Sequence, residues 1–228
     1  MMDVLEQARR LKQHTLSEYD SKRVLAEYGV PVTREKLVKS QKEAVAAAEE
    51  LGYPVVLKAC GAELTHKTEL DAIRLNLADG KSVRSAFREL KESTKGRKLQ
   101  GLLVQEMVRG QRELVMGLIR DAQFGPCVMF GLGGIYTEVL RDVSFRVAPL
   151  AERDALEMMD EIRGKKILDA FRGMQAVDRK ALAAALVALG RIGLEHEAIT
   201  EIDVNPLILT KEGRLVAVDA LVVMNGAK

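Results

Sequence analysis

Two oxygen-bearing side chains, Asn205 and Asp219, lie fourteen residues apart within the pattern of a β-hairpin. The two strand-like runs, ITEIDVNPLILT and RLVAVDAL, are joined by a turn at residues 211–213, so pairing of the runs would bring the two side chains close together. An amide carbonyl and a carboxylate are hard oxygen donors, and Mg²⁺ usually takes only one or two protein oxygens, with phosphates and water completing its shell. The spacing is therefore compatible with a magnesium site.

A row of polar side chains on the first run bears on this interpretation. Glu201, Asp203 and Asn205 alternate by two, which places all three on one face of the strand. This clustering of acidic and amide side chains favours the interpretation as a magnesium site. The other interpretation is that Asn205-Pro206 is only a strand-breaking bend and that Asp219 is a solvated strand end.

Lys58 interrupts the otherwise apolar run VVLKA, whose β-branched content is typical of a buried strand. An unpaired ammonium would be costly to bury there, so Lys58 needs an anionic partner. Either a neighbouring carboxylate neutralises the ammonium, or the ammonium reaches a ligand phosphate as a point charge. The residues alone leave both partners open.

Two further segments carry residue types suited to phosphate chemistry. The run GLGGI at residues 131–135 supplies bare backbone that could approach a phosphate, and a tight strand turn explains it equally well. His66 lies in the loop sequence THKTE, where a neutral imidazole could accept a phosphoryl group; an exposed loop histidine without chemistry is the alternative. The sequence matches neither a P-loop nor a Rossmann fingerprint.

The elements that must position these residues fall into two regions. In the first, the patterns predict helices at residues 17–29, 40–52 and 82–93 and strands at 31–38, 55–59 and 72–77. Residues 95–98 form a polar joint, after which strand patterns dominate through Phe145, followed by helices within 152–169 and at 178–194 and by the C-terminal hairpin. We therefore expect an α+β fold of two lobes, residues 1–99 and 100–228, with the ligand site in the cleft between them.

Composition narrows the class of protein. The 228 residues are 47% hydrophobic, which suffices for a sizeable core. The 35 basic and 33 acidic residues leave a net charge of +2, so no global charge draws the chain to nucleic acid or to a membrane surface. The charged N-terminal stretch, the lack of a long apolar run and two cysteines without metal-ligand spacing predict a cytoplasmic protein with buried thiols.

Several long motifs resemble one known family. The runs LVQEMV, RELVMGLIRDAQFGPCVMFGLGGIYTEVLRDVSFRVAPL and EIDVNPL are similar, in the same order, to the ATP-grasp β subunit of NDP-forming acyl-CoA synthetases, the ADP-forming acetyl-CoA synthetase group. The similarity extends from Leu16 to Val223, and the length resembles that of a free-standing β subunit. The resemblance implies an ATP-grasp fold, with ATP or ADP bound in the cleft between two α+β lobes.

The resemblance also implies a role for each candidate residue. Asn205 and Asp219 match the family's magnesium ligands, and Asp203 and Glu201 would tune the approach of the phosphoryl donor. His66 matches a β-subunit histidine that carries the phosphoryl group between an α-subunit histidine and the nucleotide. The implied nucleotide contacts are Lys58 and the Gly133 and Gly134 backbone for phosphate, Glu106, Met107 and Val108 for adenine, and Glu113 for the ribose or its surroundings.

The implied reaction is acyl-CoA plus ADP plus phosphate giving acid, CoA and ATP. Because the acyl-phosphate and thioester chemistry needs further domains, the resemblance implies an α subunit with CoA-binding and ligase domains, in an α2β2 assembly. This chain departs from the family after His66, where a glycine pair is common and the sequence reads Glu69-Leu70-Asp71-Ala72. Fewer glycines predict a stiffer loop.

Two other functions use fewer of these residues. A self-sufficient ATP-grasp ligase, joining a carboxylate to an amine through an acyl phosphate, would leave His66 incidental. A non-catalytic nucleotide-binding subunit that regulates a partner would leave the partner's activity independent of Asn205 and Asp219. We favour the acyl-CoA synthetase subunit because it alone uses Lys58, His66, Asn205 and Asp219 together.

Overall fold

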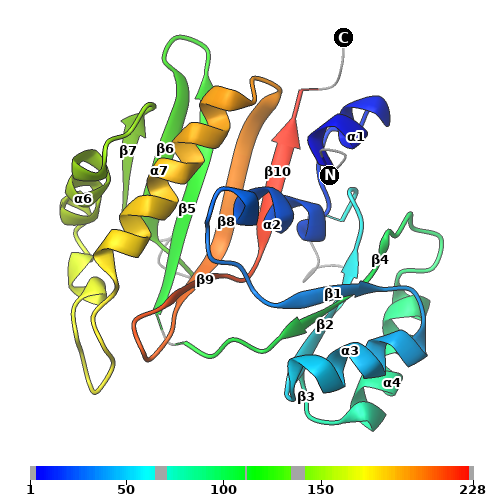
Figure 1. Cartoon of the computed structure of the whole chain (residues 1–228). Helices are drawn as coiled ribbons and strands as arrows, with labels where there is room; N and C mark the ends of the chain where they lie inside the picture. Colours follow the sequence, from blue (N-terminus) through cyan, green and yellow to red (C-terminus); the bar gives the residue numbers. More distant parts are fainter. Residues whose placement is uncertain (1–3, 65–70, 111, 135–141, 226–228) are drawn as a thin grey trace. The chain divides into compact units, whose positions relative to one another are not determined.

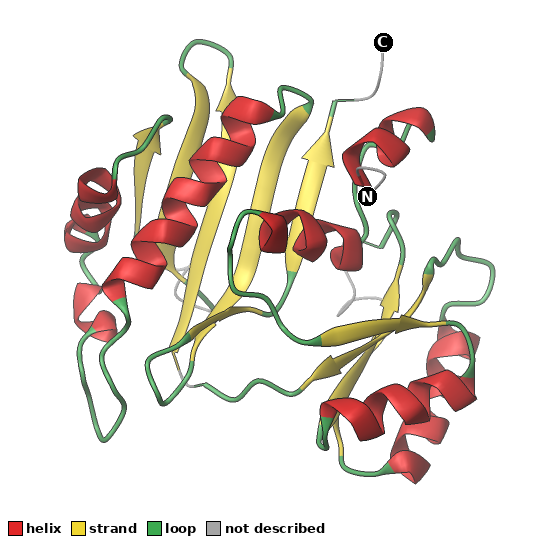
Figure 2. Ribbon diagram, in the orientation of Figure 1, coloured by secondary structure: helices red, strands yellow, loops and turns green. Residues whose placement is uncertain are grey.

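The computed structural model describes residues 4–64, 71–110, 112–134 and 142–225. The chain packs into two compact units. The small unit comprises Thr15–Tyr19 and Thr33–Met107, and the large unit comprises Met1–His14, Asp20–Val32 and Val108–Lys228. Helices and mainly antiparallel sheets occur in both, so the predicted α+β class is confirmed (Figures 1 and 2).

The small unit is a four-stranded antiparallel sheet in the order β1-β4-β2-β3. Its strands are β1 (Glu35–Val38), β2 (Val55–Cys60), β3 (Ile73–Leu77) and β4 (Gly101–Glu106). Two helices, α3 (Gln41–Leu51) and α4 (Gly80–Ser93), pack together against this sheet (Figure 1). Every residue of β2 is buried, as the apolar run predicts.

Local sequence signals set the ends of these helices. Ser40 caps α3 and accepts a hydrogen bond from the Glu43 backbone N–H, while Glu43 reaches back to the cap, as the Ser-x-x-Glu spacing predicts. The predicted start of α4 at Ser82 is two residues late. Asp79 is the actual cap and accepts from the Ser82 N–H at 2.7 Å, so the helix already begins at Gly80.

The large unit contains a six-stranded sheet in the order β10-β8-β5-β6-β7, with β9 also paired to β8. Its strands are β5 (Arg112–Asp121), β6 (Gly125–Leu132), β7 (Val143–Val147), β8 (Ile199–Leu209), β9 (Leu215–Ala217) and β10 (Ala220–Met224). The described helical elements that lie wholly or mostly in this unit are α1 (Val4–Arg10), α2 (Glu18–Glu27), α6 (Glu152–Glu161), the 3₁₀ turn η1 (Lys165–Leu168) and α7 (Arg179–Glu195). Helix α7 packs on β5, β6 and β8, and α6 packs beside it on β6 and β7 (Figures 1 and 2).

Two strands differ from the sequence patterns. The strand expected from Pro31 begins only at Glu35. The helices expected within residues 152–169 are confirmed as α6 and η1, and between them the backbone N–H groups of Arg163 and Gly164 donate to the Asp142 carboxylate at 2.8 and 2.7 Å. The last predicted strand is divided into β9 and β10 at residues 218–219.

The two units also divide the chain differently from the boundary expected between residues 99 and 100. Strand β4 belongs to the small unit, because it pairs with both β1 and β2 in the middle of that sheet. The polar residues 95–98 are therefore a loop between α4 and β4. Residues near the N-terminus, including most of α2, pack with the large unit.

Candidate functional site

The C-terminal hairpin brings Asn205 of β8 opposite Asp219, which lies between β9 and β10. Strand β8 pairs with β10 at Val204↔Ala220 and with β9 at Leu207↔Ala217, in the same register. That register sets Asn205 across from Asp219. At the adjacent pair of positions, the Val218 N–H donates to the Pro206 carbonyl at 3.0 Å. The proximity that the hairpin spacing predicts is confirmed.

A β-bulge lies at the same point on the other side of β8. Leu114 of β5 pairs with Leu207 and Met116 pairs with Val204, so the single residue Val115 faces both Asn205 and Pro206. Bulges bend the strand and redirect side chains, and they are common next to functional sites. The regular ladder is thus interrupted on both sides of Asn205, because β9 and β10 are also separated there.

Carboxylates gather beside this position. Glu201 and Asp203 are at least partly exposed, whereas Ile202 and Val204 between them are buried, so the predicted alternation on one strand face is confirmed. Burial, together with the negative charges of Glu201 and Asp219, raises the pKa of the Asp203 carboxyl to about 6, and burial is the largest of these causes. A cation bound here would relieve this repulsion.

The donor set suits a hard divalent cation that keeps most of its ligands from phosphate and water. Asn205 and Asp219 offer one amide and one carboxylate oxygen, which matches the small number of protein oxygens that Mg²⁺ usually takes. Within the described ranges no group of three or more His, Cys, Asp or Glu side chains is arranged to hold a metal by itself.

Glu113, Gly133 and Gly134 lie together at the ends of β5 and β6. The Gly133 N–H donates to the Glu113 carbonyl at 2.8 Å. A Cβ atom on Gly133 would lie 2.8 Å from the Glu113 carbonyl carbon, and one on Gly134 would lie 2.8 Å from a Glu113 carboxylate oxygen. Gly134 also has φ +61°, in the left-handed region that favours glycine. Three of the residues predicted to contact the nucleotide are thus neighbours.

Glu113, beside Gly133 and Gly134, lies on the same face of the large unit's sheet as Asp203 of the hairpin. Along β5, Glu113, Val115 and Gly117 point to one face of the sheet, and Leu114, Met116 and Leu118 point to the other. The Leu118 side chain approaches α7, since a Cβ on Gly193 of that helix would meet it at 2.5 Å. Glu113 therefore points away from α7, and strand pairing with Gly117 puts Asp203 on that same side.

Lys58 is held by a carboxylate within the small unit. Its ammonium lies 2.7 Å from the Glu18 carboxylate, and the two side chains are only 3% and 1% exposed. Of the two partners that the residues leave open, the structure shows the carboxylate. Lys58 lies in the centre of the sheet, between Leu103 of β4 and Ile73 of β3.

Two of the residues predicted to contact adenine, Glu106 and Met107, make hydrogen bonds within the small unit. The Glu106 carboxylate accepts hydrogen bonds from the backbone N–H and the Nε of Arg34, both at 2.8 Å. The Met107 N–H donates to the Pro54 carbonyl at 3.3 Å. Val108 is the first residue of the large unit's long segment. His66 lies outside the described residues.

Sequence reasoning missed the polar residues on the buried stripe of α2. Glu18, Ser21 and Lys22 are all buried. The Lys22 ammonium donates to the carbonyl of Val218, the residue before Asp219, at 3.0 Å, and the Ser21 hydroxyl accepts from the Val222 N–H of β10 at 3.1 Å. Counting back from the buried Leu25 at helical spacing would have shown that these polar side chains lie on the apolar face.

Comparison with known proteins identifies relatives over nearly the full length. The model of the ATP-grasp domain family matches residues 7–224. The acetate–CoA ligase [ADP-forming] I subunit beta of Pyrococcus furiosus is 40% identical over 226 residues, covering 97% of each chain. The acetate–CoA ligase [ADP-forming] I of Archaeoglobus fulgidus is 40% identical over 194 residues, which are 83% of this chain but only 28% of that longer protein.

Solved structures of a related synthetase are also similar to this chain over nearly its full length. A dinucleotide-forming acetyl-coenzyme A synthetase 1 of Ca. Korarchaeum cryptofilum, in complex with coenzyme A and Ca-AMPCP, superposes with a TM-score of 0.93 at 44% identity over 98% of this chain and 99% of that one. Two further structures of that synthetase, at 43% identity and the same coverage, have TM-scores of 0.88 and 0.86. One is described with a phosphorylated phosphohistidine segment in site I orientation, the other with Mg-AMPPCP and the segment pointing towards the nucleotide-binding site. None of the described helices of the present chain has the length and apolar character of a membrane span.

Proposed function

Because this chain belongs to the ATP-grasp family, among the β subunits of ADP-forming acyl-CoA synthetases, we propose that it transfers a phosphoryl group between a histidine and ADP. The complete reaction is acyl-CoA plus ADP plus phosphate giving acid, CoA and ATP. The observation that carries the proposal is the shared sheet face of the large unit, on which Asn205 and Asp219 lie opposite each other near Glu113 and the two glycines.

Asn205 and Asp219 hold Mg²⁺ in this proposal. Their donor chemistry and their opposite positions on the hairpin support the assignment. Bound Mg²⁺ supplies positive charge that neutralises phosphate oxygens as the phosphoryl group is transferred. Asp203 and Glu201 tune the approach of the phosphoryl donor in this proposal, and their negative charge also attracts the cation.

The other predicted site residues contact the nucleotide in this proposal. Gly133 and Gly134 let the backbone approach the phosphates, because neither position has room for a Cβ atom without moving Glu113. Glu113 accepts hydrogen bonds from the ribose. Lys58 contributes positive charge toward the phosphates, with Glu18 orienting its ammonium. The backbone of Glu106, Met107 and Val108 contacts the adenine.

His66 is the proposed phosphoryl carrier. The support is the motif resemblance, together with the phosphohistidine segment of the related synthetase and its two described orientations. The acyl and CoA chemistry belongs to a separate α subunit, in an α2β2 complex. That partner is supported by the beta-subunit relative of the same length and by the single-chain relative, of which this chain spans only 28%.

Labelling of His66 tests the proposal directly. The chain is incubated with its α subunit, Mg²⁺ and γ-³²P-ATP, and the product is tested for an acid-labile, base-stable phosphohistidine. We expect label on the wild-type chain and on His14→Asn, a control at an exposed histidine, and none on the β chain of His66→Asn. An active complex in which His66 is never labelled would refute the carrier role, and turnover of ATP with an acid and an amine by His66→Asn alone would instead support a self-sufficient ligase.

A further inference from the structure

Lys22 of α2 is a lysine buried within the large unit, with a relative exposure of 1%. Its ammonium donates to the Val218 carbonyl at 3.0 Å. A hydrogen bond to a neutral carbonyl returns less free energy than the burial of an ammonium costs. The stability of the fold alone is therefore a poor reason for a lysine at this position, and the place that it contacts supplies a better one.

That place is the break between β9 and β10, where Val218 directly precedes Asp219. The Val218 N–H donates to the Pro206 carbonyl at 3.0 Å, and the Val218 carbonyl accepts from Lys22. This carbonyl belongs to the peptide group that also contains the Asp219 nitrogen, and a peptide group is planar. Holding the carbonyl therefore fixes the plane from which the main chain of Asp219 starts.

The N-terminal part of the large unit also holds the chain on each side of this break. At the end of β9, the Ala217 N–H donates to the Pro31 carbonyl at 2.8 Å. Within β10, the Val222 N–H donates to the Ser21 hydroxyl at 3.1 Å. The contact of Lys22 lies between these two, so it secures the part of the edge where neither strand continues.

The direction of the Asp219 carboxylate depends on its own main chain. Its Oδ1 accepts a hydrogen bond from the N–H of the next residue, Ala220, at 2.8 Å. Asn205 lies opposite Asp219 in the register of the hairpin. A rotation of the peptide group before Asp219 would therefore move the carboxylate relative to the Asn205 side chain.

Mg²⁺ tolerates such a displacement poorly. It demands a nearly ideal octahedron of ligands at about 2.0–2.1 Å, whereas Ca²⁺ accepts a flexible shell of oxygens at about 2.3–2.6 Å. A displaced Asp219 carboxylate should therefore weaken the binding of Mg²⁺ more than the binding of Ca²⁺. A general loss of stability would not distinguish the two cations.

We propose that Lys22 is a positioning residue for the magnesium site: by holding the Val218 carbonyl, it keeps the Asp219 carboxylate opposite Asn205 in the geometry that Mg²⁺ requires. This inference rests on the proposed function of Asp219 and Asn205 as metal ligands. Lys22 acts through the main chain of Val218 and Asp219, and all of these residues belong to the large unit.

The test compares two Lys22 variants with the wild-type chain in the complete complex with the α subunit. Lys22→Met removes the ammonium and keeps a flexible unbranched side chain. Lys22→Gln keeps a polar amide, but its shorter side chain draws the donor back from the Val218 carbonyl. Ser21→Ala is the matched control on α2, because it removes the contact to Val222, three residues beyond Asp219.

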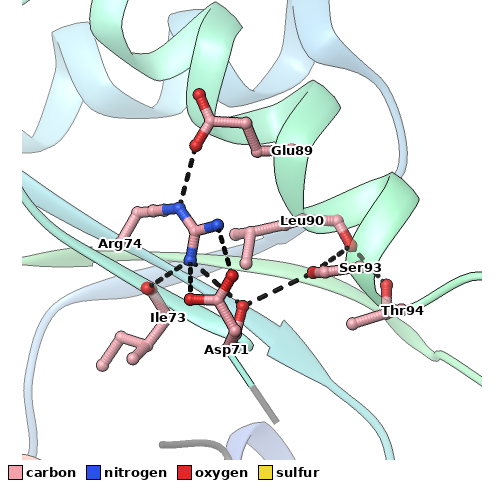
Figure 3. A network of polar contacts seen from close by, with 7 residues as sticks. All are labelled: Asp71, Ile73, Arg74, Glu89, Leu90, Ser93 and Thr94. Atoms are coloured by element: carbon pink, nitrogen blue, oxygen red, sulfur yellow. Dashed lines mark hydrogen bonds and ion pairs between the residues drawn. The ribbon is translucent and has the colours of Figure 1, made fainter.

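Arg74→Met is a second control, for the loss of a cation that holds main-chain carbonyls. Arg74 donates to the Ile73 and Asp71 carbonyls at 3.0 and 3.1 Å and to the Glu89 carboxylate at 2.9 Å (Figure 3). Its replacement removes one positive charge and two carbonyl contacts. All three partners belong to the small unit, so this control leaves the contacts of the hairpin in place.

The readouts are the affinity of the complex for ADP with Mg²⁺, with Ca²⁺ and with EDTA, and the unfolding temperature. We expect each Lys22 variant to lower the ADP affinity about tenfold in Mg²⁺, a loss typical of residues that support a metal ligand, and less than about threefold in Ca²⁺. The affinity in EDTA should stay at the wild-type value. Ser21→Ala and Arg74→Met should keep the wild-type ratio of the Mg²⁺ and Ca²⁺ affinities, whatever their unfolding temperatures.

A wild-type ratio in a folded Lys22 variant would overturn the inference, and so would an equal loss with both cations. If neither Lys22 variant folds, Lys22 is required for the fold itself, and the positioning role is overturned as well. Asp219→Ala separates this inference from the proposed function. If Asp219→Ala still gains ADP affinity from Mg²⁺, the metal site itself is wrong; if that gain is lost while the Lys22 variants behave as wild type, only the positioning role fails.

Discussion

Replacing Asp203 with asparagine should stabilise the protein in a pH-dependent way. The fold holds this carboxyl where burial and the charges of Glu201 and Asp219 raise its pKa from 3.8 to about 6. Each pKa unit corresponds to roughly 1.36 kcal/mol, so keeping Asp203 ionised in the folded state costs about 3 kcal/mol. Asparagine has nearly the same shape and no charge to desolvate, so the variant avoids this cost.

The sign and the pH window follow from proton binding. Below about pH 4 the carboxyl is protonated in both folded and unfolded chains, and the cost is absent. Between about pH 4 and 6 the unfolded chain has released the proton while the folded chain still holds it, so raising the pH destabilises the folded state. Above pH 6 the full cost applies. The stability difference between Asp203→Asn and wild type should therefore grow by about 3 kcal/mol from pH 4 to pH 7.

Urea unfolding at a series of pH values, without divalent cations, measures this difference. Asp121→Asn is a control of opposite sign, because the Phe124 and Gln123 N–H groups lower the pKa of the Asp121 carboxyl, and the stability it contributes is lost as the pH falls. Parallel pH profiles for Asp203→Asn and wild type would refute the reasoning. Saturating Mg-ADP should shrink the difference, because nearby positive charge lowers the pKa of Asp203.

Three further predictions concern the other site residues. Asp219→Ala should abolish the Mg²⁺-dependent part of ADP binding in calorimetry while leaving the circular dichroism spectrum intact; unchanged binding would exclude it as a metal ligand. Gly134→Ala and Gly125→Ala should each lower the free energy of unfolding by about 1–2 kcal/mol, because both glycines have positive φ. Only Gly134→Ala should weaken ADP binding, because its new Cβ atom would press on the Glu113 carboxylate, whereas nothing lies within 4 Å of a Cβ atom on Gly125. Lys58→Met should destabilise the chain by about 3–5 kcal/mol in urea, because the buried Glu18 carboxylate loses the ammonium that balances it, and Glu18→Gln/Lys58→Met should recover part of that loss; equal losses in the two variants would contradict this pairing.

The sequence determined the features that depend on local order. The position of the hairpin turn fixes the pairing register, because each residue before the turn faces the residue equally far after it. This alone predicts that Asn205 lies opposite Asp219. The period of two along β8 predicts that Glu201 and Asp203 share a face. Motifs in family order identified the fold and the relatives, because sequence similarity over the whole chain requires no knowledge of contacts.

Only the tertiary structure decided which distant groups meet. The carboxylate beside Lys58 comes from Glu18, forty positions earlier, and the ammonium beside Val218 comes from Lys22. Strand β4 belongs to the small unit because it forms antiparallel pairs with β1 on one side and β2 on the other. The interruption between β9 and β10 coincides with the bulge of β8 against β5, a pairing that hairpin periodicity does not contain. Such contacts depend on the packing of separate elements, and the order of residues within one element carries no record of its partner.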